Sequence, residues 1–195
     1  PKVEFSTLRE KKWENRIKHK NLILSVREKI WVDKHEPVKY AYDPAWKPFE
    51  WMDDLQNHTG IVSDLLKLIE EKSSIDFVAV NSKTWTQAID KVVSKEASMF
   101  SGVGETKKRL KYLNFTEHTL YSTPYVLVSR QGEDYLDGLN NINNKRIAVL
   151  KNSAIHNRLE EERIHPKLIP LDTPKDAFVK LGENKIDVFI VNGTT

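Results

Sequence analysis

The chain has 195 residues, 39% of them hydrophobic, and its 31 basic and 28 acidic side chains give a formal net charge of +3. This length fits one α/β domain or two compact lobes, and the near balance of charge argues against nucleic acid as a partner, because nucleic-acid binding requires a concentrated basic face. The absence of cysteine excludes disulfide frameworks and thiolate metal sites, and no apolar run reaches the roughly 20 residues of a membrane span.

The first 35 residues predict helical structure. Apolar side chains recur every three to four positions with a break near His19, and Ser25 followed by Glu28 predicts the capping box of a second helix. Pro37 then ends the helix, because it forces the preceding residue into an extended conformation. We interpret the first 20 residues as tied to a neighbour rather than as part of a core.

Strands and helices alternate from residue 38 onward. The expected strands are 38–42, 51–52, 76–80, 97–100, 112–115, 120–130, 146–150, 168–171 and 186–191. The expected helices are 61–72, 84–93, 152–162 and 173–181, while 43–50 is expected to be a loop and 131–144 a loop with a short helix. This alternation indicates a mostly parallel α/β architecture, and the long extended run in its middle indicates a crossover between two lobes.

The most informative stretch for function is 106–116, which follows a turn marked by Gly102 and Gly104. Thr106 is a suitable N-cap for a short turn, and Arg109 lies within that turn, close to free backbone amides. A guanidinium group beside free amides can bind a carboxylate or another planar anion. The alternative is a solvated basic surface that also includes three lysines: Lys107, Lys108 and Lys111.

Two tryptophans and one carboxylate receive separate interpretations. Trp46 lies between two prolines on a loop, which favours ligand contact, whereas Trp85 at helical spacing favours a core position. Asp43 is better explained as capping the Pro44 turn or orienting a ligand than as a catalytic acid.

Other chemistry-bearing patterns favour ordinary structural roles. The six histidines lack metal-ligand spacing, and the run 160–162 of three glutamates predicts a solvated helix face. The sequence contains no recognisable nucleophile set and no phosphate-binding loop. We therefore predict no catalytic residue, no metal site and no cofactor.

The order of several segments resembles a known protein family. These segments are 29–32, 35–37, 42–50, 60–64, the helix at Trp85, 106–116, 145–153 and 185–189. Together they resemble the extracellular solute-binding proteins of family 3, and they are more similar still to the Venus-flytrap sensor domains of bacterial hybrid histidine kinases. The resemblance covers about 24–191 and implies a two-lobed α/β fold of the type II periplasmic-binding-protein class. The implied divisions are an N-terminal helical extension at 1–35, lobe 1 at 36–122 and lobe 2 at 123–195.

The resemblance also implies a site in which the lobes close over a small ligand. Arg109 matches the arginine that clamps the ligand's α-carboxylate, and Thr106 matches the threonine of the same motif. Trp46 matches an aromatic residue that packs on the ligand, beside Asp43 and Phe49. The other implied ligand-binding positions are Ser101, Gly102, Asn152, Ser153 and Asn192.

Some of these positions depart from the pattern of amino-acid binders. Gly102 stands where serine often supplies a hydroxyl, and Asn192 occupies the position of the aspartate that takes the α-amino group. An amide pairs with an ammonium group less strongly than a carboxylate does. The expected ligand is therefore an amino acid or a small carboxylate, and the departures favour the carboxylate or a less charged solute.

The resemblance implies a sensor module of a two-component histidine kinase. Such a module would lie in the periplasm, tethered to a membrane-spanning receptor of the inner membrane. It could be a monomer or a dimer. Two alternatives remain: a periplasmic substrate-binding protein of an amino-acid-type ABC transporter, and an enzyme on the same fold. The segment 8–16 resembles the closing helix of a preceding flytrap domain. The sequence stops at 193–195, where a crossover should return to lobe 1, so we expect a fragment or a lobe 1 without its last elements.

Overall fold

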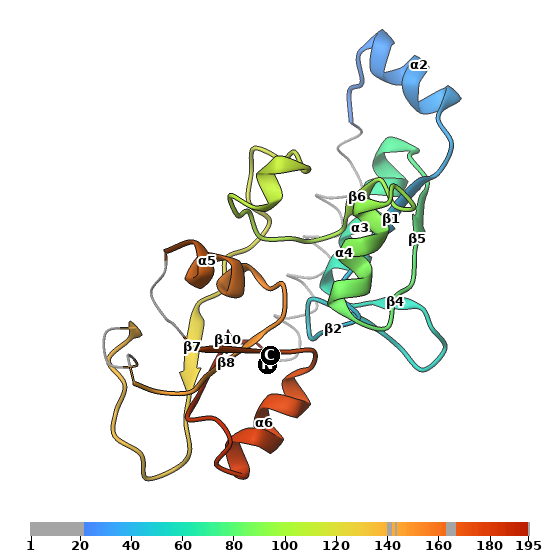
Figure 1. Cartoon of the computed structure of the whole chain (residues 1–195). Coiled ribbons are helices and arrows are strands. Elements are labelled where there is room, and N and C mark those ends of the chain that lie inside the picture. The colour runs from blue at the N-terminus through green and yellow to red at the C-terminus, as the bar shows by residue number, and fades with distance from the viewer. Residues whose placement is uncertain (1–21, 140–141, 143, 163–166, 195) are drawn as a thin grey trace, which may run out of the picture.

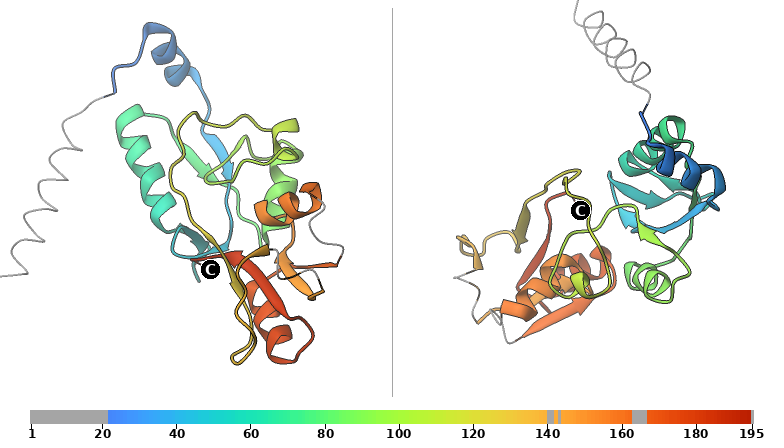
Figure 2. Two further views of the ribbon diagram at one scale, coloured as in Figure 1. Left: turned by 90° about the vertical axis from the view of Figure 1, so that its left-hand side faces the viewer. Right: turned by 90° about the horizontal axis from the view of Figure 1, so that it is seen from above.

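A computed structural model describes residues 22–139, 142, 144–162 and 167–194 of the chain. These residues form two α/β lobes that lie side by side (Figures 1 and 2). The helix expected at 8–16 falls outside the described residues. The first described helix, α2 (Val26–Lys34), carries the predicted capping box: the Ser25 hydroxyl accepts from the Glu28 amide at 3.3 Å, and the Glu28 carboxylate accepts from the Ser25 amide at 2.7 Å. No residue of α2 is buried, and Figure 1 shows it at the far end of the first lobe.

The first lobe is built on a parallel sheet with the strand order β5–β1–β6. The bounds of its elements are β1 Val38–Ala41, β5 Phe77–Ala79, β6 Met99–Phe100, α3 Ile61–Ser73 and α4 Trp85–Val93. Successive side chains of a strand point to opposite faces, so Tyr40 and Tyr42 pack with Leu66 of α3, while Ala41 packs with Ala88 of α4. The two helices therefore cover opposite faces of this sheet.

A small antiparallel sheet adjoins the first lobe between β1 and α3. Its strands are β2 Ala45–Trp46, β3 Glu50–Met52 and β4 His58–Thr59, in the order β2–β3–β4. The segment expected to be a loop at 43–50 therefore contains a short strand, in which Trp46 pairs with Glu50. This pairing fixes two side chains that contribute to the site described below.

The second lobe holds a four-stranded sheet with the order β7–β10–β8–β9. Its elements are β7 Tyr125–Val128, β8 Ile147–Leu150, β9 Leu168–Leu171, β10 Val188–Asn192, α5 Ala154–Glu162 and α6 Pro174–Gly182. β7 is antiparallel to β10, and the other pairs are parallel. Ile155 of α5 packs on one face of the sheet and Ala177 of α6 packs on the other, so each face has its own apolar core.

The crossover between the lobes differs from the sequence-based expectation. The predicted strand at 112–115 is wrong, because the Tyr112 and Leu113 amides both donate to the Arg109 carbonyl and close a 3-10 turn, η1 (Arg109–Lys111). The predicted strand at 120–130 is confirmed only over β7. Pro124 immediately precedes β7 and has no amide hydrogen to donate to a neighbouring strand.

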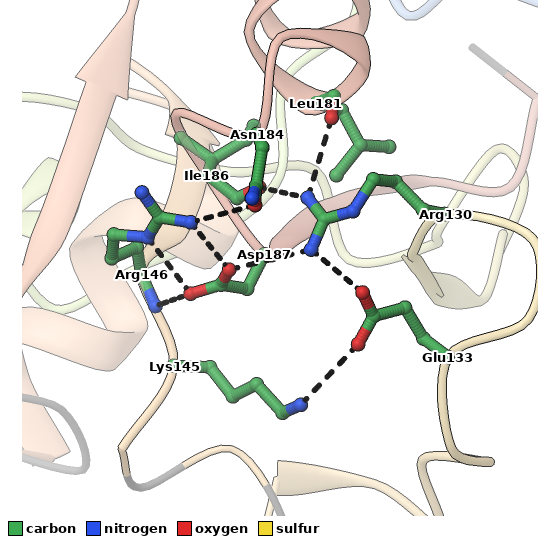
Figure 3. A network of polar contacts seen from close by, with 8 residues as sticks. All are labelled: Arg130, Glu133, Lys145, Arg146, Leu181, Asn184, Ile186 and Asp187. Atoms are coloured by element: carbon green, nitrogen blue, oxygen red, sulfur yellow. Dashed lines mark hydrogen bonds and ion pairs between the residues drawn. The ribbon is translucent and has the colours of Figure 1, made fainter.

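A network of polar contacts ties the end of α6 to the start of β8 (Figure 3). The Asp187 carboxylate accepts from the guanidinium of Arg146 at 2.7 and 3.0 Å and from its backbone amide at 2.8 Å. Arg130 donates to the Ile186 carbonyl at 2.6 Å and pairs with Glu133 at 2.8 Å. The hydrogen bonds from Arg146 hold the pKa of Asp187 well below its usual range.

We predict that Asp187→Asn destabilises the fold at neutral pH by about 1–3 kcal/mol, because charged hydrogen bonds become neutral ones. The folded-state pKa of Asp187 is depressed, so its contribution is present above the unfolded pKa and is lost as pH falls. Urea unfolding should give a lower free energy of unfolding for Asp187→Asn than for the unmodified chain at neutral pH, and equal values at strongly acidic pH. Asp64→Asn is the control, because it removes an exposed carboxylate whose partner Lys67 is also exposed. Equal losses of stability in Asp187→Asn and Asp64→Asn would contradict a stabilising role for the Asp187 network.

Candidate functional site

A cavity of about 830 Å³ lies between the lobes and is lined from both of them. Most of the sequence-predicted site residues line it, namely Asp43, Trp46, Ser101, Gly102, Arg109, Ser153 and Asn192. Phe49, Thr106 and Asn152 are not part of the lining. Phe49 packs behind other rings, Thr106 is buried in the turn that carries Arg109, and Asn152 contributes its backbone to a contact between the lobes.

The turn at Thr106 has the predicted cap. The Thr106 hydroxyl accepts from the Arg109 amide at 3.2 Å, so a side-chain hydrogen bond caps the turn that leads into η1. The Arg109 residue is only 2% exposed, whereas the neighbouring Lys107 and Lys108 are exposed, so the basic run contains both a buried and solvated side chains. Burial lowers the pKa of Arg109 from its ordinary value.

Arg109 crosses from the first lobe to the second. Its Nη1 donates to the Gly104 carbonyl at 2.6 Å, and its Nη2 donates to the Asn152 carbonyl at 2.8 Å. The guanidinium lies over the Trp85 ring, 5.4 Å from the ring centre. The described residues thus give this cation carbonyl and aromatic partners rather than a carboxylate.

The Asn152 carbonyl also accepts from Nε1 of Trp85 at 3.0 Å, and the Asn152 side chain donates to the Thr86 hydroxyl at 3.3 Å. Asn152 adopts a positive φ of 59°, a left-handed conformation that asparagine tolerates, in the turn between β8 and α5. We call the group Arg109, Trp85 and Asn152 the lobe contact. One backbone carbonyl of the second lobe therefore takes two donors from the first.

The lobes approach closely beside the lobe contact. A Cβ atom at Gly104 would lie 3.3 Å from the Cβ of Ala154, so a side chain at this position would press on the start of α5. The Lys108 amide donates to the Glu161 carboxylate of α5 at 3.1 Å. Figures 1 and 2 show η1 lying next to α5. The structure is therefore a closed arrangement of the two lobes at this edge of the cavity.

Three rings gather where the crossover passes the first lobe, and we call them the aromatic corner: Trp46, Phe49 and Tyr121. Phe49 and Tyr121 are stacked with ring centres 4.2 Å apart, and Trp46 lies 5.0 and 5.5 Å from them. A Cβ atom at Gly102 would lie 2.8 Å from the Tyr121 hydroxyl. The hydroxyl of Tyr121 therefore occupies the space that a side chain at position 102 would take.

Two carboxylates lie next to the aromatic corner. Glu50 is fully buried and accepts from the Asp43 amide at 3.0 Å and from the Ser101 hydroxyl, with Nε2 of His58 at 3.5 Å. Asp43 lines the cavity, and burial raises its pKa to about 6. A hydrogen bond from the Ala45 amide to Asp43 opposes this shift, while the charge of Glu50 adds to it.

The second lobe contributes polar side chains that are already engaged. Asn192 donates to the Thr123 hydroxyl, and its oxygen accepts from the Thr194 amide at 3.2 Å and from the Thr194 hydroxyl at 2.7 Å. The Ser153 hydroxyl accepts from the His156 amide at 3.2 Å and so caps α5. Both residues line the cavity while stabilising the local backbone.

Sequence reasoning missed Glu50, Tyr121 and the polar role of Trp85. Glu50 follows Phe49 in a segment that carried the family resemblance, yet nothing in the sequence indicates that its carboxylate turns inward. Tyr121 lies in a run that predicts a strand. Trp85 is half-buried and packs with Phe100, as the core interpretation predicts, but its indole N–H also reaches the second lobe.

Within the described ranges, no group of three or more histidine, aspartate or glutamate side chains is arranged to hold a metal ion. No helix in that part of the chain is both long enough and apolar enough to span a membrane.

Comparison with protein families gives a match to the bacterial extracellular solute-binding proteins, family 3, over residues 38–194. The virulence sensor protein BvgS of Bordetella pertussis is 26% identical over 171 residues, which are 85% of this chain and 13% of BvgS. The chain therefore spans only a small part of that relative.

Solved structures show the same fold. The crystal structure of the Bordetella pertussis BvgS periplasmic VFT2 domain has a TM-score of 0.73 and 24% identity, over 88% of this chain and 72% of that one. A histidine kinase sensor domain with similarity to periplasmic binding proteins has a TM-score of 0.71 and 20% identity, over 82% of this chain and 69% of that one. The two-lobed Venus-flytrap fold expected from the sequence is confirmed.

The lobe contact predicts that Trp85→Phe favours open arrangements of the lobes. The variant keeps a ring for Arg109 and Phe100 but removes the N–H donor to Asn152, a loss of about 0.5–1.5 kcal/mol. Small-angle X-ray scattering should show a larger radius of gyration than in the unmodified chain. Trp31→Phe on the exposed helix α2 is the control. Unchanged scattering for Trp85→Phe would argue against the lobe contact.

The raised pKa of Asp43 predicts that Asp43→Asn stabilises the fold at mildly alkaline pH. The folded-state pKa of about 6 exceeds the ordinary value of 3.8, so the folded chain binds this proton more tightly, and stability falls as pH rises through about 6. The variant removes this loss, and its melting temperature should exceed that of the unmodified chain above pH 6 but not in acid. Glu105→Gln, which removes an exposed carboxylate from the same cavity, should not reproduce the effect.

Proposed function

Because the chain belongs to the bacterial extracellular solute-binding proteins of family 3, we propose that it binds a small solute between its lobes as the extracytoplasmic sensor module of a two-component histidine kinase. The observation that carries this proposal is the cavity lined from both lobes and bordered by the lobe contact. A solute that touches both lobes changes the free energy of closure, which is the requirement for a ligand-driven switch.

The sensor role draws on the relatives. BvgS is a virulence sensor protein, and a similar solved structure is a histidine kinase sensor domain. The chain spans 13% of BvgS, so kinase activity, attachment to a membrane-spanning receptor, a periplasmic location and dimerisation are parts of the proposal. We place lobe 1 at 36–122, lobe 2 at 123–195 and the extension at 1–35, with the lobe boundary falling in the crossover before β7.

Ligand recognition is proposed to use Arg109 and the residues around the cavity. A guanidinium has five N–H donors, and the bonds to Gly104 and Asn152 use one from each terminal nitrogen. A solute carboxylate would offer Arg109 a charged acceptor, which hydrogen-bonds more strongly than a neutral carbonyl. Ser153 at the start of α5 and Asn192 at the end of β10 would contact the same solute from lobe 2. An amino acid or a small carboxylate fits these donors.

A periplasmic substrate-binding protein of an amino-acid-type ABC transporter is the second candidate. It is favoured by the family match, which describes extracellular solute binding. The complete reading frame separates the two: membrane-spanning and kinase segments support the sensor, and their absence supports the transporter component. We propose no catalytic role for this segment. Saturable turnover of a small carboxylic acid that is lost in Asp43→Asn would overturn that view.

The binding proposal predicts that at least one small solute raises the melting temperature of the full chain in a screen of amino acids, small carboxylates and amines. A ligand at about 100 times its Kd, bound only to the folded state, adds about 2.7 kcal/mol of stability. A carboxylate ligand should lose roughly tenfold or more in affinity in Arg109→Lys, because lysine lacks the planar fork of donors.

Lys107→Gln is the matched control for this experiment, since it removes an exposed charge two residues away. Arg109→Ala tests the same assignment if the lysine keeps partial binding. Equal carboxylate affinity in the unmodified chain and both Arg109 variants would show that Arg109 does not hold the anion.

A further inference from the structure

We propose that a second ligand site lies at the outer edge of the contact between the lobes and that it binds inorganic phosphate. The site is an open pocket of about 640 Å³ between the turn at 106–111 and α5, and we call it the outer pocket. Its lining is shared by the two lobes: Lys107, Lys108 and Lys111 from the first, and Asn157, Glu160 and Glu161 from the second. None of these residues lines the cavity between the lobes, so the inference goes beyond the proposed function.

The backbone brings the two halves of the outer pocket together. Its three lysines fall within five consecutive positions of one short turn, so their side chains leave from nearly the same place. Its three α5 residues follow the spacing i, i+3 and i+4, which puts them on one face of the helix. The hydrogen bond from the Lys108 amide to the Glu161 carboxylate joins the two halves. A ligand in this pocket therefore contacts both lobes.

The outer pocket has an excess of positive charge. No ion pair among the described residues includes Lys107, Lys108 or Lys111. Glu161 already accepts a hydrogen bond from the backbone of the turn. Three ammonium groups beside two carboxylates favour an anion, and an anion with more than one charge gains most from them.

A buried histidine behind the outer pocket engages the second glutamate. Nδ1 of His156 accepts from the Asn152 amide at 3.0 Å, which leaves the ring proton on Nε2, 3.3 Å from Glu160. Burial lowers the pKa of His156, and the charges of Lys108 and Lys151 add to this shift, while Glu160 opposes it. The ring is therefore neutral at neutral pH, and the positive charge of the pocket resides on its lysines.

Asn157 selects a ligand that can donate a hydrogen bond. This residue lines the outer pocket and is 3% exposed, and its side-chain oxygen has no donor among the described residues. A buried acceptor without a donor is unfavourable, so a ligand with a hydroxyl gains a contact there. Inorganic phosphate keeps a P–OH group at neutral pH, whereas sulfate has none and a phosphate monoester loses its last one above about pH 6. Free phosphate therefore fits the pocket better than either of them.

The position of the outer pocket couples phosphate to lobe closure. Phosphate that contacts the turn at 106–111 and α5 together binds the closed arrangement more tightly than an open one, and so it shifts the equilibrium towards closure. The coupling is reciprocal, so a solute that closes the cavity between the lobes would raise the affinity for phosphate by the same factor.

The test is isothermal titration of the full chain with inorganic phosphate, sulfate and methyl phosphate, at constant ionic strength and about pH 7.5, above the second pKa of the ester. Phosphate should bind roughly tenfold or more tightly than sulfate or methyl phosphate. Changing Lys108 and Lys111 together to glutamine should weaken phosphate binding roughly tenfold. The matched control changes Lys83 and Lys151 to glutamine, because these two exposed lysines line the cavity between the lobes instead.

Asn157→Leu separates the hydrogen bond from the charge, because it leaves every lysine in place. It should remove the preference for phosphate over sulfate while sulfate still binds. Small-angle X-ray scattering of the unmodified chain should show a smaller radius of gyration with phosphate than without it.

The proposal is overturned if phosphate does not bind, if sulfate or methyl phosphate binds as tightly, or if the control pair weakens phosphate as much as the Lys108 and Lys111 pair does. The lysine changes alter only exposed side chains, so they decide the question even where Asn157→Leu does not fold. Each of these results leaves solute binding between the lobes intact, because that function is measured separately with amino acids, carboxylates and amines.

Discussion

The carbonyl oxygen of Asn152 is the point on which the arrangement of the lobes depends. It accepts from Arg109 and from Trp85, so both of its lone pairs receive donors from the other lobe. The left-handed conformation of Asn152 directs this carbonyl, and a glycine at position 104 permits the close approach beside it. The Thr106 cap sets the turn that carries Arg109, and the guanidinium of Arg109 lies over the Trp85 ring.

This contact leaves a buried cation with dipoles as partners. Carbonyl groups compensate for the lost hydration of a guanidinium only in part, which agrees with the lowered pKa of Arg109. Next to the aromatic corner the charges are negative instead, because the carboxylates of Asp43 and Glu50 lie close together and the pKa of Asp43 is raised. The cavity wall therefore holds separated charges of both signs that the protein does not bring together. A solute that pairs with either charge gains more than it would at a neutral wall.

The sequence predicts the repeating parts of the fold and misses the parts that depend on long-range contacts. The caps at Ser25 and Thr106 act over three residues, and both are present as expected. The crossover strand was overpredicted, because the aromatic and β-branched residues of 112–124 fit a strand but have no partner strand. Placement of Arg109 in the cavity wall followed from a motif, whereas its Asn152 partner lies 43 residues away and has no local signal. The positions of Glu50 and Tyr121 beside the cavity depend on the fold and have no local sequence signal.

Tyr121 links the cavity to the rotation between the lobes, because it belongs both to the crossover and to the cavity wall. Its ring stacks on Phe49 and its hydroxyl lies over Gly102, so the crossover is attached to the first lobe beside the predicted ligand. Four residues later the same segment enters β7 and pairs with β10 of the second lobe. A rotation between the lobes must bend the backbone between Tyr121 and Tyr125, because both ends are fixed by packing or by a strand ladder. A group bound against Tyr121 therefore acts directly on the segment that sets the angle between the lobes, without a relay through either core.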